Sequence, residues 1–160
     1  MDSIIKILVI EDDDPKLQQI VEAVIAVIPE AKLETTKSLN SACRALDKES
    51  FDLVLLDMTL PTFEGGKTSN ASGRQKTQGG RDVLRYMWES EISSKVYVVS
   101  QFRDFPDDSE TTIGLDELGN QLREEFPTLY FGSIYFEHKS TAWKVQLISI
   151  LKLTYENSNR

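Results

Sequence analysis

The order of apolar segments along the chain constrains the fold more than any other feature. Four short apolar runs of strand length and one weaker strand candidate, at residues 32–35, alternate with stretches in which apolar residues recur at helical spacing. The expected strands lie at residues 4–10, 32–35, 51–56, 96–99 and 129–136, and the expected helices at 14–28, 39–46, 81–89, 115–126 and 143–155. Because near-continuous apolar runs are typical of strands buried on both faces, this order predicts a doubly wound five-stranded parallel sheet with helices on both sides. Asp14 is expected to cap the first helix, with Pro15 in its first turn.

Two segments interrupt this alternation. Residues 65–80 are rich in glycine and carry three basic residues and no acid, which predicts a flexible polar insertion. This insertion is expected either to act on the functional site rather than on the fold or to be a neutral tether. Residues 101–112 form an acidic connector, within a region 101–130 that is long for a connection of this kind. The chain is therefore expected to form one domain over residues 1–160, with the insertion at 65–80.

Composition excludes several classes of function. The chain has 26 acidic and 18 basic residues and a net charge of −8, which argues against broad contact with nucleic acid or an anionic membrane. A single cysteine, Cys43, excludes an internal disulfide framework and a cysteine-based zinc site. Neither the basic-then-apolar order of a signal peptide nor an apolar run of ~18 residues is present, so a cytoplasmic location is expected.

Residues that carry chemistry follow the ends of the expected strands. Glu11 and Asp12 follow the first strand and Asp57 the third, while Ser100 ends the fourth and Lys139 follows the fifth. A doubly wound sheet brings these strand ends together at one edge. Three carboxylates there suit Mg²⁺, and a carboxylate held in such a site is a nucleophile that can form an aspartyl-phosphate. Lys139 and Ser100 are then expected to bind the phosphoryl oxygens.

Four sequence motifs, in order along nearly the whole chain, resemble those of a known protein family. ILVIEDD covers the first strand and its acids, DLVLLDMTLP the third strand and Asp57, VVS the end of the fourth strand, and YFEHK the end of the fifth. With these motifs the chain resembles a response-regulator receiver domain of two-component signalling. The resemblance implies a flavodoxin-like (βα)5 fold and an atypical, stand-alone member of the family.

The resemblance also implies a role for each matching residue. Asp57 matches the phospho-acceptor, Glu11 and Asp12 the acidic pair that holds Mg²⁺ with Asp57, Thr59 the backbone-carbonyl metal ligand, Ser100 the switch hydroxyl, Phe136 the switch aromatic and Lys139 the phosphate-binding lysine. The implied partners are a histidine kinase or phosphotransfer protein, as in a phosphorelay, and a separate effector protein. The chain is then a phospho-acceptor and not an enzyme, beyond its own phosphorylation and dephosphorylation.

Two departures from the family pattern keep other functions open. Gln101 stands where a small residue usually follows the switch hydroxyl, and Ser140 stands where a proline usually follows the lysine. These departures and the two long segments favour, as an alternative, a receiver-like interaction module that is never phosphorylated. A less favoured alternative is a phosphatase with an aspartyl nucleophile, for which the sequence LLDMTLPT lacks the second acid, since Thr59 occupies its place.

Overall fold

The computed structural model describes residues 3–64, 79–106 and 112–159 and centres on one parallel sheet. Its strands are β1 (Lys6–Ile10), β2 (Lys32–Thr36), β3 (Leu53–Leu56), β4 (Lys95–Ser100) and β7 (Tyr130–Tyr135). They are hydrogen-bonded in the order β2-β1-β3-β4-β7, and every neighbouring pair is parallel. This is the flavodoxin-like order, so the predicted fold class is confirmed.

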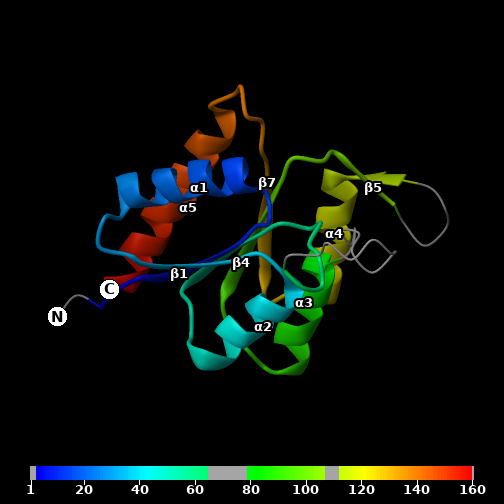
Figure 1. Ribbon diagram of the computed structural model, residues 1–160, viewed down its shortest axis with the longest axis horizontal. Coiled ribbons are helices and arrows are strands. Elements are labelled where there is room, and N and C mark those ends of the chain that lie inside the picture. The colour runs from blue at the N-terminus through cyan, green and yellow to red at the C-terminus, as the bar shows by residue number, and fades with distance from the viewer. Residues whose placement is uncertain (1–2, 65–78, 107–111, 160) are drawn as a thin grey trace.

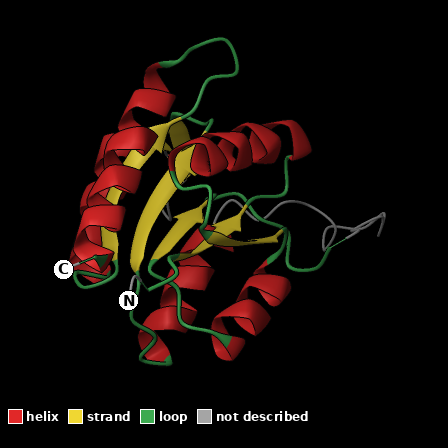
Figure 2. Ribbon diagram, turned by 90° about the vertical axis from the view of Figure 1, so that its left-hand side faces the viewer, coloured by secondary structure: helices red, strands yellow, loops and turns green. Residues whose placement is uncertain are grey.

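Helices cover both faces of this sheet, as Figures 1 and 2 show. They are α1 (Asp14–Val27), α2 (Leu39–Lys48), α3 (Gly79–Glu89), α4 (Leu115–Glu125) and α5 (Ala142–Ser158). Helices α1 and α5 pack on one face, and α2, α3 and α4 pack on the other. Among the helices of the described residues, none has the length and apolar character needed to cross a membrane.

The central strands β1 and β3 are buried on both sides, as their apolar sequences predict. In β1, Leu8 and Ile10 belong to the core beneath α2, α3 and α4, whereas Ile7 and Val9 belong to the core beneath α1 and α5. All four side chains are at most 1% exposed. Successive residues of a strand point to opposite faces, so one apolar run supplies both cores and fixes the strand in its register.

Helix α1 is capped one residue earlier than its sequence indicates. The Asp13 side chain accepts a hydrogen bond from the backbone N–H of Lys16 at 3.1 Å, so Asp13 and not Asp14 is the N-cap. Asp14 then lies inside the first turn, where a carboxylate is stabilised by the helix dipole. This cap places Lys16 in the first turn of α1, directly above the carboxyl end of β1.

Helix α3 begins two residues before the expected start at residue 81, because its first two residues are glycines in close contact with the segment after β3. A Cβ added at Gly80 would lie 2.6 Å from the carbonyl oxygen of Asp57, and one at Gly79 would lie 2.6 Å from that of Leu60. The predicted insertion at 65–80 is therefore wrong for its last two residues, which are helical and buried. Residues 65–78 lie outside the described residues, so the predicted flexibility and role of that segment stay predictions.

The predicted acidic connector at 101–112 contains regular structure that the sequence analysis missed. Strands β5 (Asp104–Pro106) and β6 (Thr112–Gly114) form a two-stranded antiparallel sheet between β4 and α4. Phe105 is 3% exposed in the core beneath α4, and Ile113 packs against the same core. These two apolar side chains anchor the segment to the core. Its many acidic residues had indicated only a connector. Residues 107–111 lie outside the described residues.

Candidate functional site

The predicted carboxylates meet at the carboxyl edge of the sheet. The backbone N–H of Glu11 donates to the carbonyl of Thr36 at 2.9 Å, and that of Asp57 donates to the carbonyl of Ile10 at 3.0 Å. These bonds continue the ladders of β1 with β2 and β3, and so fix where both side chains leave the sheet. One carboxylate oxygen from each of Glu11, Asp12 and Asp57 lies within 4.8 Å of the others.

Two of the three carboxyl groups in this cluster are buried, so the interactions between their charges are strong. Glu11 is 1% exposed and Asp57 4% exposed, while Asp12 is partly exposed. Loss of hydration disfavours the charged form of a carboxyl group, and burial raises the pKa of Glu11 to about 8. The ammonium of Lys16 lowers this pKa and the nearby carboxylate of Asp57 raises it, but the effect of burial is the largest. Glu11 in the folded protein therefore holds a proton more readily than an exposed glutamate does.

A lysine that the sequence analysis did not select lies inside the cluster. The Lys16 side chain is fully buried, and its Nζ pairs with Oε1 of Glu11 and lies 3.4 Å from Oδ1 of Asp57. The same Nζ donates a hydrogen bond of 2.7 Å to the carbonyl oxygen of Val99, at the end of β4. Lys16 thus connects β1, β3 and β4 at the edge where the predicted site lies.

The two carboxylate oxygens of Asp57 have different surroundings. Oδ1 faces Lys16 and is buried, and it accepts no hydrogen bond from any described residue. Oδ2 accepts a long hydrogen bond of 3.4 Å from the hydroxyl of Thr59, which is itself buried. Asp57 therefore keeps acceptor capacity for a ligand, since a buried carboxylate oxygen without a full hydrogen bond is unfavourable.

The two predicted switch residues are both buried beside the cluster. Ser100 is 0% exposed, and its hydroxyl donates to the carbonyl of Phe102 and accepts from the backbone N–H of the same residue, both at 3.0 Å. Phe136 is 1% exposed, its ring centroid lies 4.7 Å from that of Trp143, and Lys16 Nζ lies 5.8 Å from the Phe136 centroid. The predicted switch roles stay predictions.

Lys139 has a different environment from that of the carboxylates. It lies in the loop after β7, which ends at Tyr135, and its side chain is exposed. Within the described residues, the ion pairs of Glu11 and Asp57 are with Lys16, and Lys139 takes part in no ion pair. The role of Lys139 as the phosphate-binding lysine stays a prediction. The metal-ligand roles of Glu11, Asp12, Asp57 and the Thr59 carbonyl stay predictions as well.

A signal for Lys16 was present in the sequence. Positions 16, 20 and 24 lie on one face of α1, and Ile20 and Val24 are at most 1% exposed on that face. A lysine in line with core residues, in the first turn after a group of acids, indicates an ammonium turned toward the carboxylates. The apolar periodicity of the helix marks its buried face but does not by itself indicate which charged residue shares that face.

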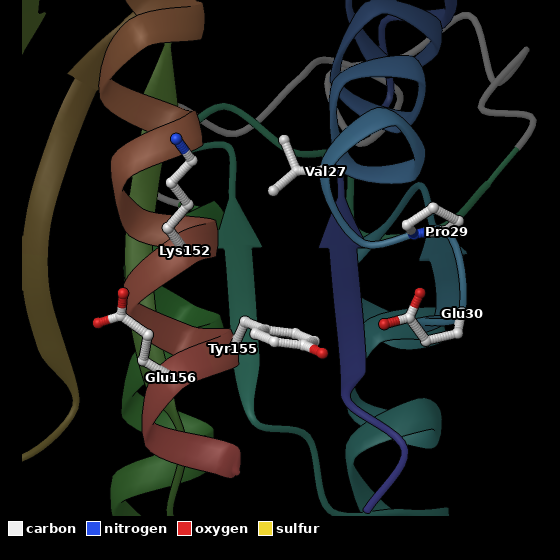
Figure 3. A pocket seen from close by; sticks show the side chains of 6 residues that line it. All are labelled: Val27, Pro29, Glu30, Lys152, Tyr155 and Glu156. Carbon is white, nitrogen blue, oxygen red and sulfur yellow. The ribbon is translucent and has the colours of Figure 1, made fainter. Parts of the chain in front are cut away.

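A surface hollow at the opposite edge of the sheet lacks such a cluster. It has a volume of about 280 Å³ and lies where α1 ends and the last turns of α5 pass (Figure 3). It is lined by Val27, Pro29, Glu30, Lys152, Tyr155 and Glu156. These residues include no three carboxylates gathered as at the carboxyl edge, so the acidic cluster is the candidate site.

Comparison with curated proteins identifies relatives over nearly the whole chain. No protein-family model matches. The Detocs response regulatory protein DtcB of Enterobacter cloacae (strain JD6301) is 28% identical over 144 residues, which span 89% of this chain and 95% of that protein. The chain therefore resembles a protein named as a response regulator, and the match covers most of both proteins.

Comparison with solved structures identifies the fold. The signal receiver domain of a LuxO repressor protein from Vibrio parahaemolyticus has a TM-score of 0.66 at 14% identity, covering 98% of this chain and 93% of that one. The receiver domain of a sensor histidine kinase from Pseudomonas aeruginosa PAO1, which has a magnesium ion coordinated in its active-site cleft, has a TM-score of 0.56 at 15% identity, covering 96% and 99%. The chain has the receiver-domain fold of response regulators.

Proposed function

We propose that this receiver domain accepts a phosphoryl group on Asp57 from a histidine kinase or phosphotransfer protein, in a reaction that requires Mg²⁺. The observation that carries the proposal is the position of Asp57, which directly follows the central strand β3 and has a carboxylate oxygen within 4.8 Å of two other carboxylates. Its Oδ1 is buried and receives no hydrogen bond from a described residue. A nucleophilic carboxylate needs this combination of proximity to a cation site and free acceptor capacity.

The residues at the carboxyl edge fit a magnesium ion by their chemistry. Glu11, Asp12 and Asp57 offer hard carboxylate oxygens, and we propose the backbone carbonyl of Thr59 as a fourth protein ligand. Mg²⁺ prefers a small number of carboxylates together with water and phosphate oxygens. When bound, it supplies positive charge that stabilises the phosphoryl oxygens.

The transfer itself needs one nucleophilic oxygen and a donor of suitable class. A carboxylate oxygen of Asp57 attacks the phosphorus of a phosphohistidine or an acyl phosphate, and the new O–P bond forms as the donor's N–P or O–P bond breaks. The leaving group departs with the bonding electron pair. The surrounding carboxylates must be neutralised for this attack, because an anionic phosphoryl group approaches an anionic cluster.

We propose that the signal leaves the protein through changed protein contacts. Receiver domains are generally signalling modules without enzymatic activity, which agrees with the response regulatory name of the relative. Ser100 and Phe136 are proposed to respond to the phosphoryl group, since both are buried at the carboxyl edge and Phe136 lies beneath Lys16. The effector partner and the cytoplasmic location stay predictions.

One observation favours the alternative of an interaction module that is never phosphorylated. Lys16 already pairs with two of the three carboxylates, so the cluster has an internal cation in the absence of metal. In that alternative Lys16 closes a structural charge network, and the site takes no phosphoryl group. The two functions make opposite predictions for one experiment.

The test is phosphorylation by acetyl phosphate, followed by intact-mass spectrometry. The wild-type protein is expected to gain the mass of one phosphoryl group with Mg²⁺ and none with EDTA. Asp57→Asn is the matched control, because it keeps the size of the side chain and removes the nucleophile; it is expected to gain none. No mass gain in the wild type would support the interaction module, and an equal gain in both proteins would place the acceptor elsewhere.

A further inference from the structure

We infer that Lys16 is the cation that contacts the phosphoryl group on Asp57, in the part that the sequence pattern gives to Lys139. This inference rests on the proposed function, because it concerns the same site. It follows from where the two ammonium groups lie: that of Lys16 is buried among the carboxylates, and the Lys139 side chain is exposed.

Lys16 is held firmly in place from both ends of its side chain. Its backbone N–H donates to the N-cap residue Asp13, which fixes the first turn of α1. Its Nζ donates to the Val99 carbonyl at 2.7 Å and pairs with Glu11. In register, β3 and β4 pair Leu56 with Val98, so Val99 lies beside Asp57. The ammonium is thus preorganised beside the proposed acceptor, and no large movement is needed before a reaction.

The hydrogen-bonding capacity of the ammonium leaves room for a ligand. A lysine ammonium has three N–H donors. The Val99 carbonyl and the Glu11 carboxylate account for two of them, and Asp57 Oδ1, at 3.4 Å, receives no full hydrogen bond. A phosphoryl group bonded to Asp57 brings new oxygens to this part of the site, and the third N–H is positioned to donate to one of them.

The surroundings of Lys16 strengthen this contact. The side chain is 0% exposed, and the ring of Phe136 lies beneath the ammonium at 5.8 Å from its centroid. Charge interactions are stronger where water is excluded, so one buried ammonium neutralises phosphoryl charge more effectively than an exposed lysine does. Phe136, the proposed switch aromatic, then contacts the cation that contacts the phosphoryl group, which gives phosphorylation a direct route to that residue.

The first experiment measures the rate of labelling by acetyl phosphate with Mg²⁺, by intact mass, in the full chain. Lys16→Met is expected to label about 100-fold more slowly, the usual scale for loss of one preorganised donor, and Lys16→Arg is expected to keep part of the rate. Lys139→Met is expected to lose less than Lys16→Met. Lys32→Met is the matched control, because it removes a lysine that pairs with a glutamate at the opposite edge of the sheet, and it is expected to label at the wild-type rate.

The outcomes separate this inference from the proposed function. If the wild type takes no phosphoryl group, both are overturned. If the wild type is labelled and Lys16→Met labels at the same rate, or if Lys139→Met alone has the large loss, the role of Lys16 is overturned and the proposed function stands. Far-ultraviolet circular dichroism of each variant shows whether it is folded.

A second measurement does not depend on the stability of Lys16→Met. Beryllofluoride with Mg²⁺ is a phosphoryl analogue, and its fluorine resonances in the wild-type protein report on neighbouring N–H groups by ¹⁹F NMR. We expect one fluorine resonance to shift between H₂O and D₂O because it accepts from the Lys16 ammonium. That isotope shift is expected to change in Lys16→Arg and to persist in Lys139→Met. An isotope shift that disappears only in Lys139→Met would overturn the inference.

Discussion

Two lysine–glutamate pairs lie at opposite edges of the same sheet, and they differ mainly in their exposure to solvent. At the carboxyl edge Lys16 pairs with Glu11, and the two side chains are 0% and 2% exposed. At the amino edge Lys32 pairs with Glu49 at 2.6 Å, and these side chains are 54% and 27% exposed. The charges are the same in both pairs, so any difference in behaviour comes from the surroundings.

The pKa values of the two glutamates show what burial does. The hydrogen bond from Lys32 lowers the pKa of Glu49, as expected for a carboxylate beside a cation in water. Burial raises the pKa of Glu11 although it too has a lysine partner, because desolvation exceeds the attraction. The exposed pair is a surface contact, whereas the buried pair lies in a cluster whose unfavourable negative charge an incoming metal ion can relieve.

The largest expected effect comes from breaking the buried pair. Lys16→Met leaves Glu11 and Asp57 buried without their cation, so we expect the unfolding free energy of the metal-free protein to fall by about 3–5 kcal/mol. Urea denaturation followed by circular dichroism measures this change. An unchanged unfolding midpoint would mean that the Lys16 pairing contributes nothing to the folded state.

The next effect is a pH dependence that belongs to Glu11. Its pKa is raised from 4.5 to about 8 by folding, so between these values the folded state binds more protons than the unfolded state. The unfolding free energy of the metal-free protein should therefore decrease as pH rises from about 5 to 8. Urea titrations across this range measure the decrease. Glu11→Gln should flatten the dependence, and an identical slope in wild type and variant would refute the raised pKa.

A smaller effect is expected from added Mg²⁺. An ion that binds only the folded state stabilises it by about 1.4 kcal/mol at ten times its Kd. We expect Mg²⁺ to raise the melting temperature of the wild type, and not that of Asp12→Asn, in thermal denaturation. Equal stabilisation of the two proteins would place the bound ion away from the carboxyl edge.

The smallest effect is expected at the amino edge. Lys32→Met removes an exposed ion pair, and exposed pairs contribute little because water and salt screen them. The urea midpoint should stay within experimental error of the wild type, with no change in the response to Mg²⁺. A decrease in unfolding free energy as large as that of Lys16→Met would show that exposure to solvent does not explain the difference between the two pairs.

The alternation of strand and helix patterns was sufficient to predict the fold, because the apolar runs of β1 and β3 had to be buried on both faces and each helix had an apolar face. It also predicted that Glu11, Asp12 and Asp57 would gather, since they follow strands that end at one edge. The antiparallel pair β5–β6 was missed because its anchors, Phe105 and Ile113, are isolated apolar residues in an acidic segment. No local pattern marks such a short pairing.

The lysine at the carboxylates could not be settled from spacing alone. Lys139 follows the last strand in sequence, but order along the chain does not say how far a loop carries a side chain from the sheet. Lys16 reaches the carboxylates from the first turn of α1, where the Asp13 cap sets its direction. Lys16 lies on the same buried face of α1 as Ile20 and Val24, and this shared face is the sequence signal that indicates it.

The most direct measurement of the central claim is identification of the acceptor residue. After acetyl phosphate treatment with Mg²⁺, borohydride reduces an aspartyl-phosphate to homoserine, and peptide mass spectrometry locates the change. Homoserine is expected at position 57 in the wild type and is not expected in Asp57→Asn. Reduction at another residue, or none in a wild-type protein treated with Mg²⁺ and acetyl phosphate, would contradict it.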